Sequence, residues 1–129
     1  MNARKVEVSL RNLRRALDRL GEALEVPESN TLAIDGTIQR FEFALELFWK
    51  TLKRLLAEEG VETSTPKDTL RKAFQAGWLT DEAAWLQMLS DRNTTSHIYD
   101  EETAKRIYGN IRRNYPEMVK VFEGMENMK

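Results

Sequence analysis

The sequence predicts an all-α protein, an antiparallel four-helix bundle with one additional short helix. Apolar residues recur at spacings of three and four through most of the 129 residues, as in helices with one buried face. Hydrophobic residues make up 41% and charged residues 32% of the chain, which favours amphipathic helices over disorder. Short connections between the long helical segments predict antiparallel neighbours. A chain of this length is expected to fold as a single domain, residues 1–129.

The first two helices are predicted by long apolar stripes. The first spans about residues 3 to 25, and its stripe consists of Val6, Leu10, Leu13, Leu17, Leu20 and Leu24. Asn30 or Thr31 is expected to cap the second helix, which spans about residues 31 to 59 and ends at Gly60. Its main stripe comprises Ile38, Phe41, Leu45, Phe48, Leu52 and Leu55, and a second apolar face comprises Phe43, Leu47, Trp49 and Leu56. With two apolar faces, this helix is expected to be the most buried.

A short helix is predicted next. Thr65 is a suitable N-cap, and Pro66 suits the first helical position because its missing N–H would have no helical partner there. This helix is expected to turn Leu70 and Phe74 inward and to stop at Gly77. We expect it to be an appendage of the four-helix bundle.

The fourth helix carries an arginine on its buried side. Thr80, with Asp81 and Glu82, is expected to cap it, and it should reach about Asn93. Its inward stripe consists of Trp85, Met88 and Leu89. The next position on this stripe is Arg92, so an arginine lies where a core residue is due.

The fifth helix is predicted to start at Asp100, after a run of poor helix formers at residues 93–96. Its apolar side comprises Ala104, Ile107, Ile111, Tyr115, Met118 and Phe122. Pro116 removes one backbone hydrogen bond and is expected to bend the helix.

The composition excludes several kinds of site. The chain has 0 cysteines and 1 histidine, which removes disulfides, thiol nucleophiles and metal sites built from cysteine or several histidines. The formal net charge of -1 gives no overall attraction to nucleic acid or membranes, so an anion site must be a local cluster. No signal peptide and no membrane-spanning run of roughly 20 apolar residues is found, so we expect a cytoplasmic protein.

Side chains suited to chemistry are concentrated in residues 91–100. Arg92 offers a permanent planar cation for phosphate oxygens, and His97, the only histidine, titrates near neutrality. This pair suits metal-free acid–base chemistry at a phosphodiester. On a continuous helix a spacing of five points two side chains about 140° apart, so convergence requires the break that the Thr-Thr-Ser run provides. A histidine that merely caps carbonyls at a helix end, or lies in solvent, is the structural alternative.

The segment resembles the HEPN domains, whose signature is an arginine and a histidine separated by four to six residues, here Arg92 and His97. Tyr99 completes a fuller pattern that is similar to HEPN toxins paired with minimal nucleotidyltransferase antitoxins, and Asn93 fits as the polar residue after the arginine. A second block is similar to the subfamily labelled nucleotidyltransferase substrate-binding proteins. It consists of Ile38, Gln39, Arg40, Phe41, Glu42, Phe43, Glu46, Trp49 and Lys50.

The resemblance implies a homodimer in which two Arg92–His97 segments face each other and form a metal-independent ribonuclease site. Arg92 would hold the scissile phosphate, His97 would exchange protons with the attacking 2′-hydroxyl or the leaving oxygen, and Asn93 would assist by hydrogen bonding. The expected product is a 2′,3′-cyclic phosphate, so DNA should resist cleavage.

The resemblance also implies a partner, a separate minimal nucleotidyltransferase. In similar toxins the tyrosine of the motif, here Tyr99, accepts AMP from that enzyme, and a phosphate group beside Arg92 would compete for the cation. This chain has no glycine-serine loop with paired aspartates, so no metal or cofactor is expected on it, and ATP and Mg²⁺ are expected on the partner.

A non-catalytic role is the alternative, in which the bundle is a substrate-binding subunit of a two-component nucleotidyltransferase. Arg92 and His97 would then bind anions or contact the partner. Arg11, Arg15 and Arg19, spaced by four, could form part of that contact or simply a solvated face.

Overall fold

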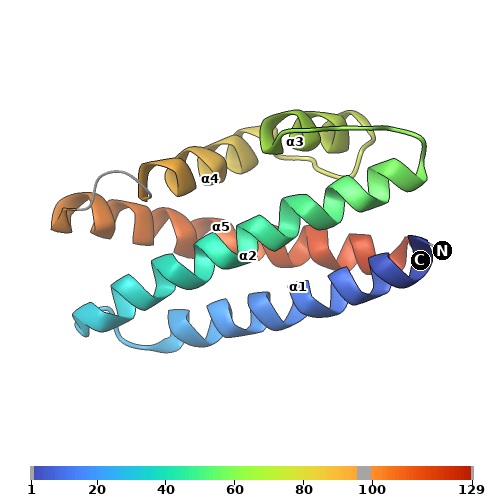
Figure 1. The fold of residues 1–129 in the computed structure, drawn as a ribbon. Coiled ribbons are helices and arrows are strands. Elements are labelled where there is room, and N and C mark those ends of the chain that lie inside the picture. Colours follow the sequence, from blue (N-terminus) through green and yellow to red (C-terminus); the bar gives the residue numbers. More distant parts are fainter. Residues whose placement is uncertain (1, 96–99, 129) are drawn as a thin grey trace.

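The computed structural model describes residues 2–95 and 100–128 (Figure 1). Its five helices are α1 (Asn2–Glu25), α2 (Thr31–Glu58), α3 (Pro66–Gln75), α4 (Glu82–Thr95) and α5 (Glu101–Asn127). The described part of the chain contains no strand, so the predicted all-α class is confirmed. No helix among the described residues combines the length and apolar character needed to cross a bilayer.

The predicted N-caps of α2 and α3 are confirmed. The side chain of Asn30 accepts a hydrogen bond from the Leu32 N–H at 3.0 Å at the start of α2. Thr65 Oγ1 accepts from Asp68 N–H at 3.1 Å at the start of α3, where Pro66 occupies the first turn. Local side-chain chemistry therefore defines where these helices begin.

Local chemistry also decides the start of α5 and the ends of α2 and α3. Asp100 Oδ1 caps α5 by accepting from Thr103 N–H at 2.8 Å. Gly60 and Gly77 follow α2 and α3 with φ of 85°, a left-handed conformation that stops a helix and that glycine adopts without strain.

The predicted Thr80 cap of α4 is wrong by one residue. The Asp81 carboxylate accepts a hydrogen bond from Ala84 N–H at 3.1 Å and so takes the capping role. Both residues are suitable caps by type, and the carboxylate carries the negative charge that the helix N-terminus favours.

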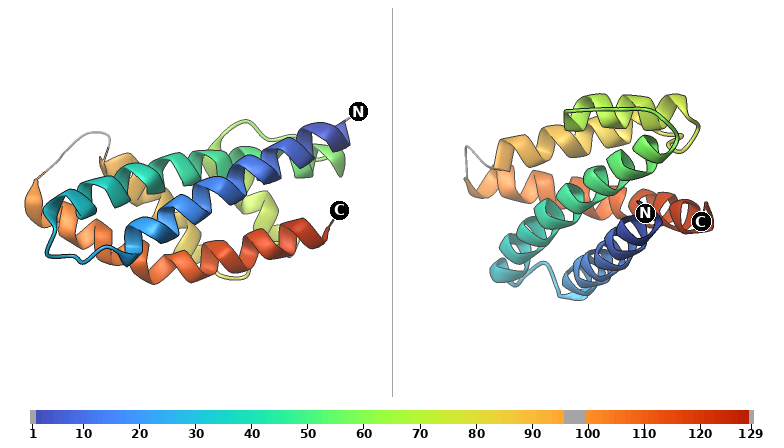
Figure 2. Two further views of the ribbon diagram at one scale, coloured as in Figure 1. Left: turned by 90° about the horizontal axis from the view of Figure 1, so that it is seen from below. Right: turned by 45° about the vertical axis from the view of Figure 1, so that its right-hand side comes forward.

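Helix α2 is central, since it packs against each of the other four helices. Figures 1 and 2 show α1 and α4 running in one direction and α2 and α5 in the other. The core includes the α1 stripe from Val6 to Leu20 and the main stripe of α2, as predicted. The antiparallel bundle is therefore the observed arrangement.

The fourth side of the bundle is shared by α3 and α4, which corrects the prediction that α3 is an appendage (Figure 2). Helix α4 has 14 residues, about half the length of α2, so it leaves part of α2 uncovered. Helix α3 packs on that part and buries Leu70 and Ala73 in the common core.

Two aromatic residues expected in the core lie at the surface instead. Phe43 is 61% exposed, because it lies at the open side of the groove between α1 and α2, where none of the described helices covers it. Phe74 is 38% exposed, because α3 turns Thr69, Leu70 and Ala73 inward and leaves Phe74 at the edge of that face.

Helix α5 continues through Pro116 as one helix and stays close to α1. Tyr115, the residue before the proline, donates its hydroxyl hydrogen to the Leu17 carbonyl at 3.0 Å. A Cβ atom at Gly21 would lie 2.5 Å from this hydroxyl, so the approach of the two helices depends on glycine there. Burial raises the pKa of Tyr115, and the charges of Asp18 and Glu25 add to the effect.

Candidate functional site

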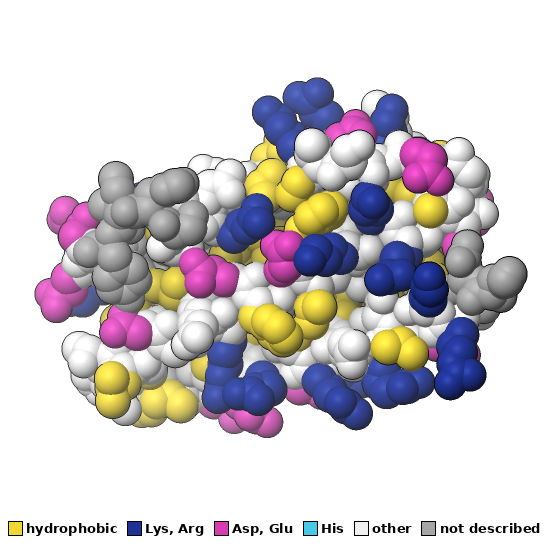
Figure 3. All heavy atoms as spheres, in the orientation of Figure 1, with side chains coloured by type: hydrophobic (Ala, Val, Ile, Leu, Met, Phe, Trp, Pro, Cys, Tyr) yellow, Lys and Arg dark blue, Asp and Glu magenta, His cyan; other side chains and the backbone are white. Residues whose placement is uncertain are grey.

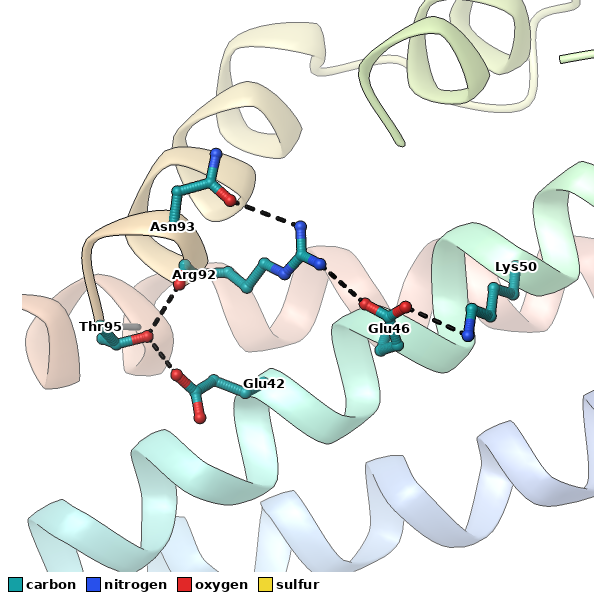
Figure 4. A network of polar contacts seen from close by, with 6 residues as sticks. All are labelled: Glu42, Glu46, Lys50, Arg92, Asn93 and Thr95. Atoms are coloured by element: carbon teal, nitrogen blue, oxygen red, sulfur yellow. Dashed lines mark hydrogen bonds and ion pairs between the residues drawn. The ribbon is translucent and has the colours of Figure 1, made fainter. Parts of the chain in front are cut away.

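Arg92 lies in the last turn of α4 and extends over α2 (Figure 4). Its Nη2 atom donates to Glu46 Oε1 at 3.0 Å, and about 30% of its side chain is exposed. The position that should hold a core residue thus holds a partly buried cation, paired with a carboxylate from the neighbouring helix. A guanidinium has five N–H donors, so this bond leaves capacity for a further anion.

Glu46 links Arg92 to a second cation. Its Oε2 atom is 3.2 Å from Lys50 Nζ, one turn further along α2. Partial burial raises the pKa of Glu46, but the Lys50 ammonium and the Arg92 charge outweigh this and hold the pKa below its ordinary value. The Trp49 indole N–H lies close enough to Glu46 to help lower its pKa, although it forms no hydrogen bond of normal geometry with a described residue. Glu46 is therefore ionised at neutral pH, and the three charges sum to one positive charge.

The end of α4 is fixed by further polar contacts (Figure 4). Asn93 Oδ1 accepts a hydrogen bond from Arg92 Nη1 at 3.4 Å. The Thr95 hydroxyl can donate to the Glu42 carboxylate or to the Arg92 carbonyl, which is 2.9 Å away. Because Glu42 is one turn before Glu46, two successive turns of α2 hold the last turn of α4.

The structure brings together only part of the predicted site. Arg92 and Asn93 are adjacent, as the motif requires, and α4 extends two residues beyond the expected end at Asn93. His97 and Tyr99 lie outside the described residues, so their convergence with Arg92 stays a prediction. Asp100, the N-cap of α5, follows the undescribed segment, and hydrogen bonds from the Thr103 backbone and side chain lower the pKa of its carboxyl.

Four residues of this site received no chemical role from the sequence, although the first three belong to the block that is similar to nucleotidyltransferase substrate-binding proteins. They are Glu42, Glu46, Lys50 and Thr95. The signal that could have found the first three is their spacing of four, which places charged side chains on one face of α2.

Behind Arg92, a buried polar cluster joins α4 to α5. Asp91 is 5% exposed and accepts a hydrogen bond from Asn110 Nδ2 at 3.1 Å. Asn110 Oδ1 in turn accepts from Arg113 Nη2 at 2.7 Å. Burial raises the pKa of Asp91, and neither the Asn110 bond nor the charges of Arg106 and Arg113 offset it. These hydrogen bonds fix the position of the last turn of α4 along α5.

Asp91→Asn is expected to raise the melting temperature at pH 7. The raised pKa means that folding favours the protonated acid, so this contribution to stability is present below the unfolded-state pKa and is lost as the pH rises through the folded-state pKa. Asparagine carries no charge and can still accept from Asn110. Thermal unfolding followed by circular dichroism from pH 3 to pH 8 checks this, and the gain should shrink toward pH 3.

Glu123→Gln, at an exposed position of α5, is the matched control and should leave the pH profile unchanged. A lower melting temperature for Asp91→Asn at pH 7 would contradict the prediction, because it would show that the charge of Asp91 stabilises the fold through Arg106 and Arg113.

Known proteins share this fold and sequence. Residues 8–127 match the model of the family described as "Nucleotidyltransferase substrate binding protein like". A Haemophilus influenzae protein named "Probable ribonuclease HepT" is 40% identical over 83 residues, which cover 60% of this chain and 57% of that protein. The aligned part thus spans little more than half of that relative.

Two solved structures extend the likeness over nearly the whole chain. A Thermus thermophilus protein has 34% identity and a TM-score of 0.76, over 90% of this chain and 97% of that chain. A Haemophilus influenzae protein has 28% identity and a TM-score of 0.69, over 95% of this chain and 98% of its own. The latter structure is described as the fold of a substrate binding domain of a nucleotidyltransferase. The chain therefore belongs to the nucleotidyltransferase substrate binding protein like family, a HEPN-like family.

Proposed function

We propose that this protein is a metal-independent endoribonuclease of the HEPN toxin type. One observation carries the proposal. Glu46 holds the partly exposed guanidinium of Arg92 at the end of α4, beside Asn93 and directly before the segment that contains His97. The relative named as a probable ribonuclease supports the same activity.

The proposed reaction needs only RNA and the side chains of the motif. The 2′-hydroxyl oxygen forms a bond to the adjacent phosphorus and loses its proton, while the bond from phosphorus to the 5′-oxygen breaks and that oxygen gains a proton. His97 exchanges these protons, Arg92 binds the phosphate oxygens as charge develops, and Asn93 adds a hydrogen bond. The products are a 2′,3′-cyclic phosphate and a 5′-hydroxyl.

The proposal includes a homodimer and a partner. Two copies would bring two Arg92–His97 segments together across one cleft, as the resemblance to HEPN domains implies. A cognate minimal nucleotidyltransferase, using its own ATP and Mg²⁺, would transfer AMP to Tyr99. The added phosphate would then lie near Arg92 and compete with RNA for its donors.

His97→Ala is expected to abolish RNA cleavage, because no other histidine can move the protons. The measurement is cleavage of RNA pools in EDTA by protein purified without its partner, after intact-mass analysis has shown that no AMP is attached. Wild type should yield cyclic-phosphate ends, and a substrate with 2′-deoxy sugars should stay intact. Equal inactivity of wild type and His97→Ala on all pools would overturn the proposal.

Tyr99→Phe is expected to prevent transfer of labelled AMP from ATP by the nucleotidyltransferase, since the acceptor oxygen is gone. Cleavage of RNA by this variant should continue in the presence of the partner and ATP, whereas the wild type should be inhibited. Persistence of the label on Tyr99→Phe would place the modification elsewhere.

The second candidate is a substrate-binding subunit of a two-component nucleotidyltransferase. The description of the family and of the Haemophilus structure favours it, and the ion pair of Arg92 with Glu46 suits a recognition site as well as a catalytic one. Under this function the wild type cleaves no RNA, and Arg92→Ala weakens binding of the enzyme's substrate.

A further inference from the structure

A basic groove lies between α1 and α2, beside the candidate site. Its volume is about 500 Å³, and the apolar residues of its lining are Val8 and Leu47. Four cationic side chains line it, and no carboxylate is among the described residues of its lining. These cations are Arg4, Lys5, Lys50 and Arg54.

Three of these cations have no anionic partner in the part of the chain that the structure describes. Arg4, Lys5 and Arg54 are exposed and form no ion pair with another described residue, while Lys50 pairs with Glu46. Figure 3 shows Lys and Arg side chains gathered on this face, over α1 and the second half of α2. The whole chain carries a net charge of -1, so this basic surface is a local feature rather than a reflection of composition.

The groove is continuous with the Arg92 site. Lys50 lines the groove and, 3.2 Å away, contacts the same Glu46 that holds Arg92 at 3.0 Å. Glu46, Lys50 and Arg54 occupy successive turns of α2, which rise by about 5.4 Å each. A path of positive charge therefore leads from Arg92 along α2 to the α1 cations, and Glu46 is neutralised within it.

We propose that this groove binds the backbone of the RNA strand whose scissile phosphate lies at Arg92, a proposal that rests on the proposed ribonuclease function. Cations without partners bind phosphates by releasing condensed counterions, which requires no base contact. Ser9 and Asn12, also in the lining, add polar groups for phosphate or ribose oxygens. The groove extends the site beyond one phosphodiester, so affinity should grow with RNA length.

Charge distinguishes RNA from a second copy of this chain as the occupant. If a second copy docked groove to groove about a two-fold axis, the cations of one groove would face the same cations of the other, which repel. A polyanion meets no such repulsion. The apolar part of the lining suits ribose and base edges as well as it suits protein. The cations therefore favour RNA over protein as the occupant.

The test compares two double variants that each remove one lysine and one arginine. Lys5→Ala with Arg54→Ala removes two of the four cations that line the groove, and Lys67→Ala with Arg71→Ala removes two exposed cations of α3 as the control. Binding is measured with each pair in the His97→Ala background, using fluorescent single-stranded RNA of about 20 nucleotides. Cleavage is measured with each pair in the wild-type background, on the same RNA and on tetranucleotides.

The groove variant is expected to bind the long RNA on the order of tenfold more weakly, and the slope of log K against log salt should fall by about 1.4, or 0.7 for each lost contact. Its KM for the long RNA should rise, while kcat and tetranucleotide cleavage stay at the level of the control. Equal binding by the two double variants would overturn the proposal that the groove binds RNA. The proposed ribonuclease function would still stand if the wild type cleaves the tetranucleotides. Unchanged RNA affinity with a dimer that dissociates in light scattering would instead assign the groove to a second copy, and a wild type that neither binds nor cleaves RNA would overturn both proposals.

Discussion

Trp85→Ala is expected to lower the free energy of unfolding by about 3–5 kcal/mol. Trp85 is fully buried on α4, and the centroid of its ring lies 4.6 Å from that of Phe48 on α2. Its indole N–H donates to Glu117 on α5 at 3.1 Å. One side chain thus fills the space between three helices, and its removal leaves a cavity that the packed core can close only in part.

Urea unfolding followed by circular dichroism measures this loss. Trp85→Phe keeps most of the packing but loses the hydrogen bond to Glu117, so it should cost less than Trp85→Ala. Leu32→Ala, at a position 77% exposed on α2, is the surface control and should change the free energy by less than about 0.5 kcal/mol. A cost for Trp85→Ala as small as that of Leu32→Ala would contradict the packing described.

The helices were predictable where local chemistry decides them. Asn30, Thr65 and Asp100 accept from backbone N–H groups within three residues, so their role follows from their sequence neighbours alone. The α1 stripe is buried for a similar reason, because one helix face repeats over many turns and must meet the rest of the core.

The errors in packing, unlike the one-residue error in the cap of α4, arose where distant parts of the chain determine the structure. Phe43 is apolar and on a predicted apolar face, but burial needs a neighbouring helix, and no described helix covers that side of the groove. The packing of α3 into the bundle depends on the length of α4, which ends before it covers all of α2. The hydrophobic periodicity of one helix indicates neither which neighbours cover it nor how long those neighbours are.

The candidate site shows the same division. Arg92 was identifiable because an arginine interrupts an apolar stripe, and that signal lies within one helix. Its pairing with Glu46 was not predictable, since it depends on the register between α2 and α4, two helices separated by α3 in the chain. The spacing of Glu42 and Glu46 indicated a charged face of α2 but not the residue that it meets.

Arg92→Ala is expected to reduce RNA cleavage by about 10²–10³-fold, under the proposed function, because loss of one charge-stabilising donor group from an enzyme typically has this effect. The guanidinium is the cation of the site that would bind the phosphate as negative charge develops. Stability should change by less than about 1 kcal/mol, because the ion pair with Glu46 is partly exposed and screened by solvent. Cleavage in EDTA, with melting curves on the same preparations, measures both.

Three further variants separate charge from position. Arg92→Lys keeps the positive charge but loses the planar fork of donors, so it should recover only part of the activity. Glu46→Gln keeps the guanidinium intact but removes the carboxylate that holds it and Lys50, and we expect a loss smaller than that of Arg92→Ala. Arg71→Ala, on the exposed side of α3, should cleave RNA at the wild-type rate. If Arg92→Ala cleaved as fast as Arg71→Ala, the phosphate would be held by another cation.

If Glu46→Gln lost as much activity as Arg92→Ala, Glu46 would take part in the reaction itself. The lowered pKa of Glu46 limits the roles that it could have in the reaction. A carboxylate that stays ionised at neutral pH is a poor proton donor, so it could act only as a base or as an anchor for the two cations. An anchor leaves the pH profile of cleavage to His97, and Glu46→Gln should then lower the rate by the same factor at every pH. Loss of the acidic limb of the profile, rather than a shift of its midpoint, would instead show that Glu46 accepts a proton during the reaction.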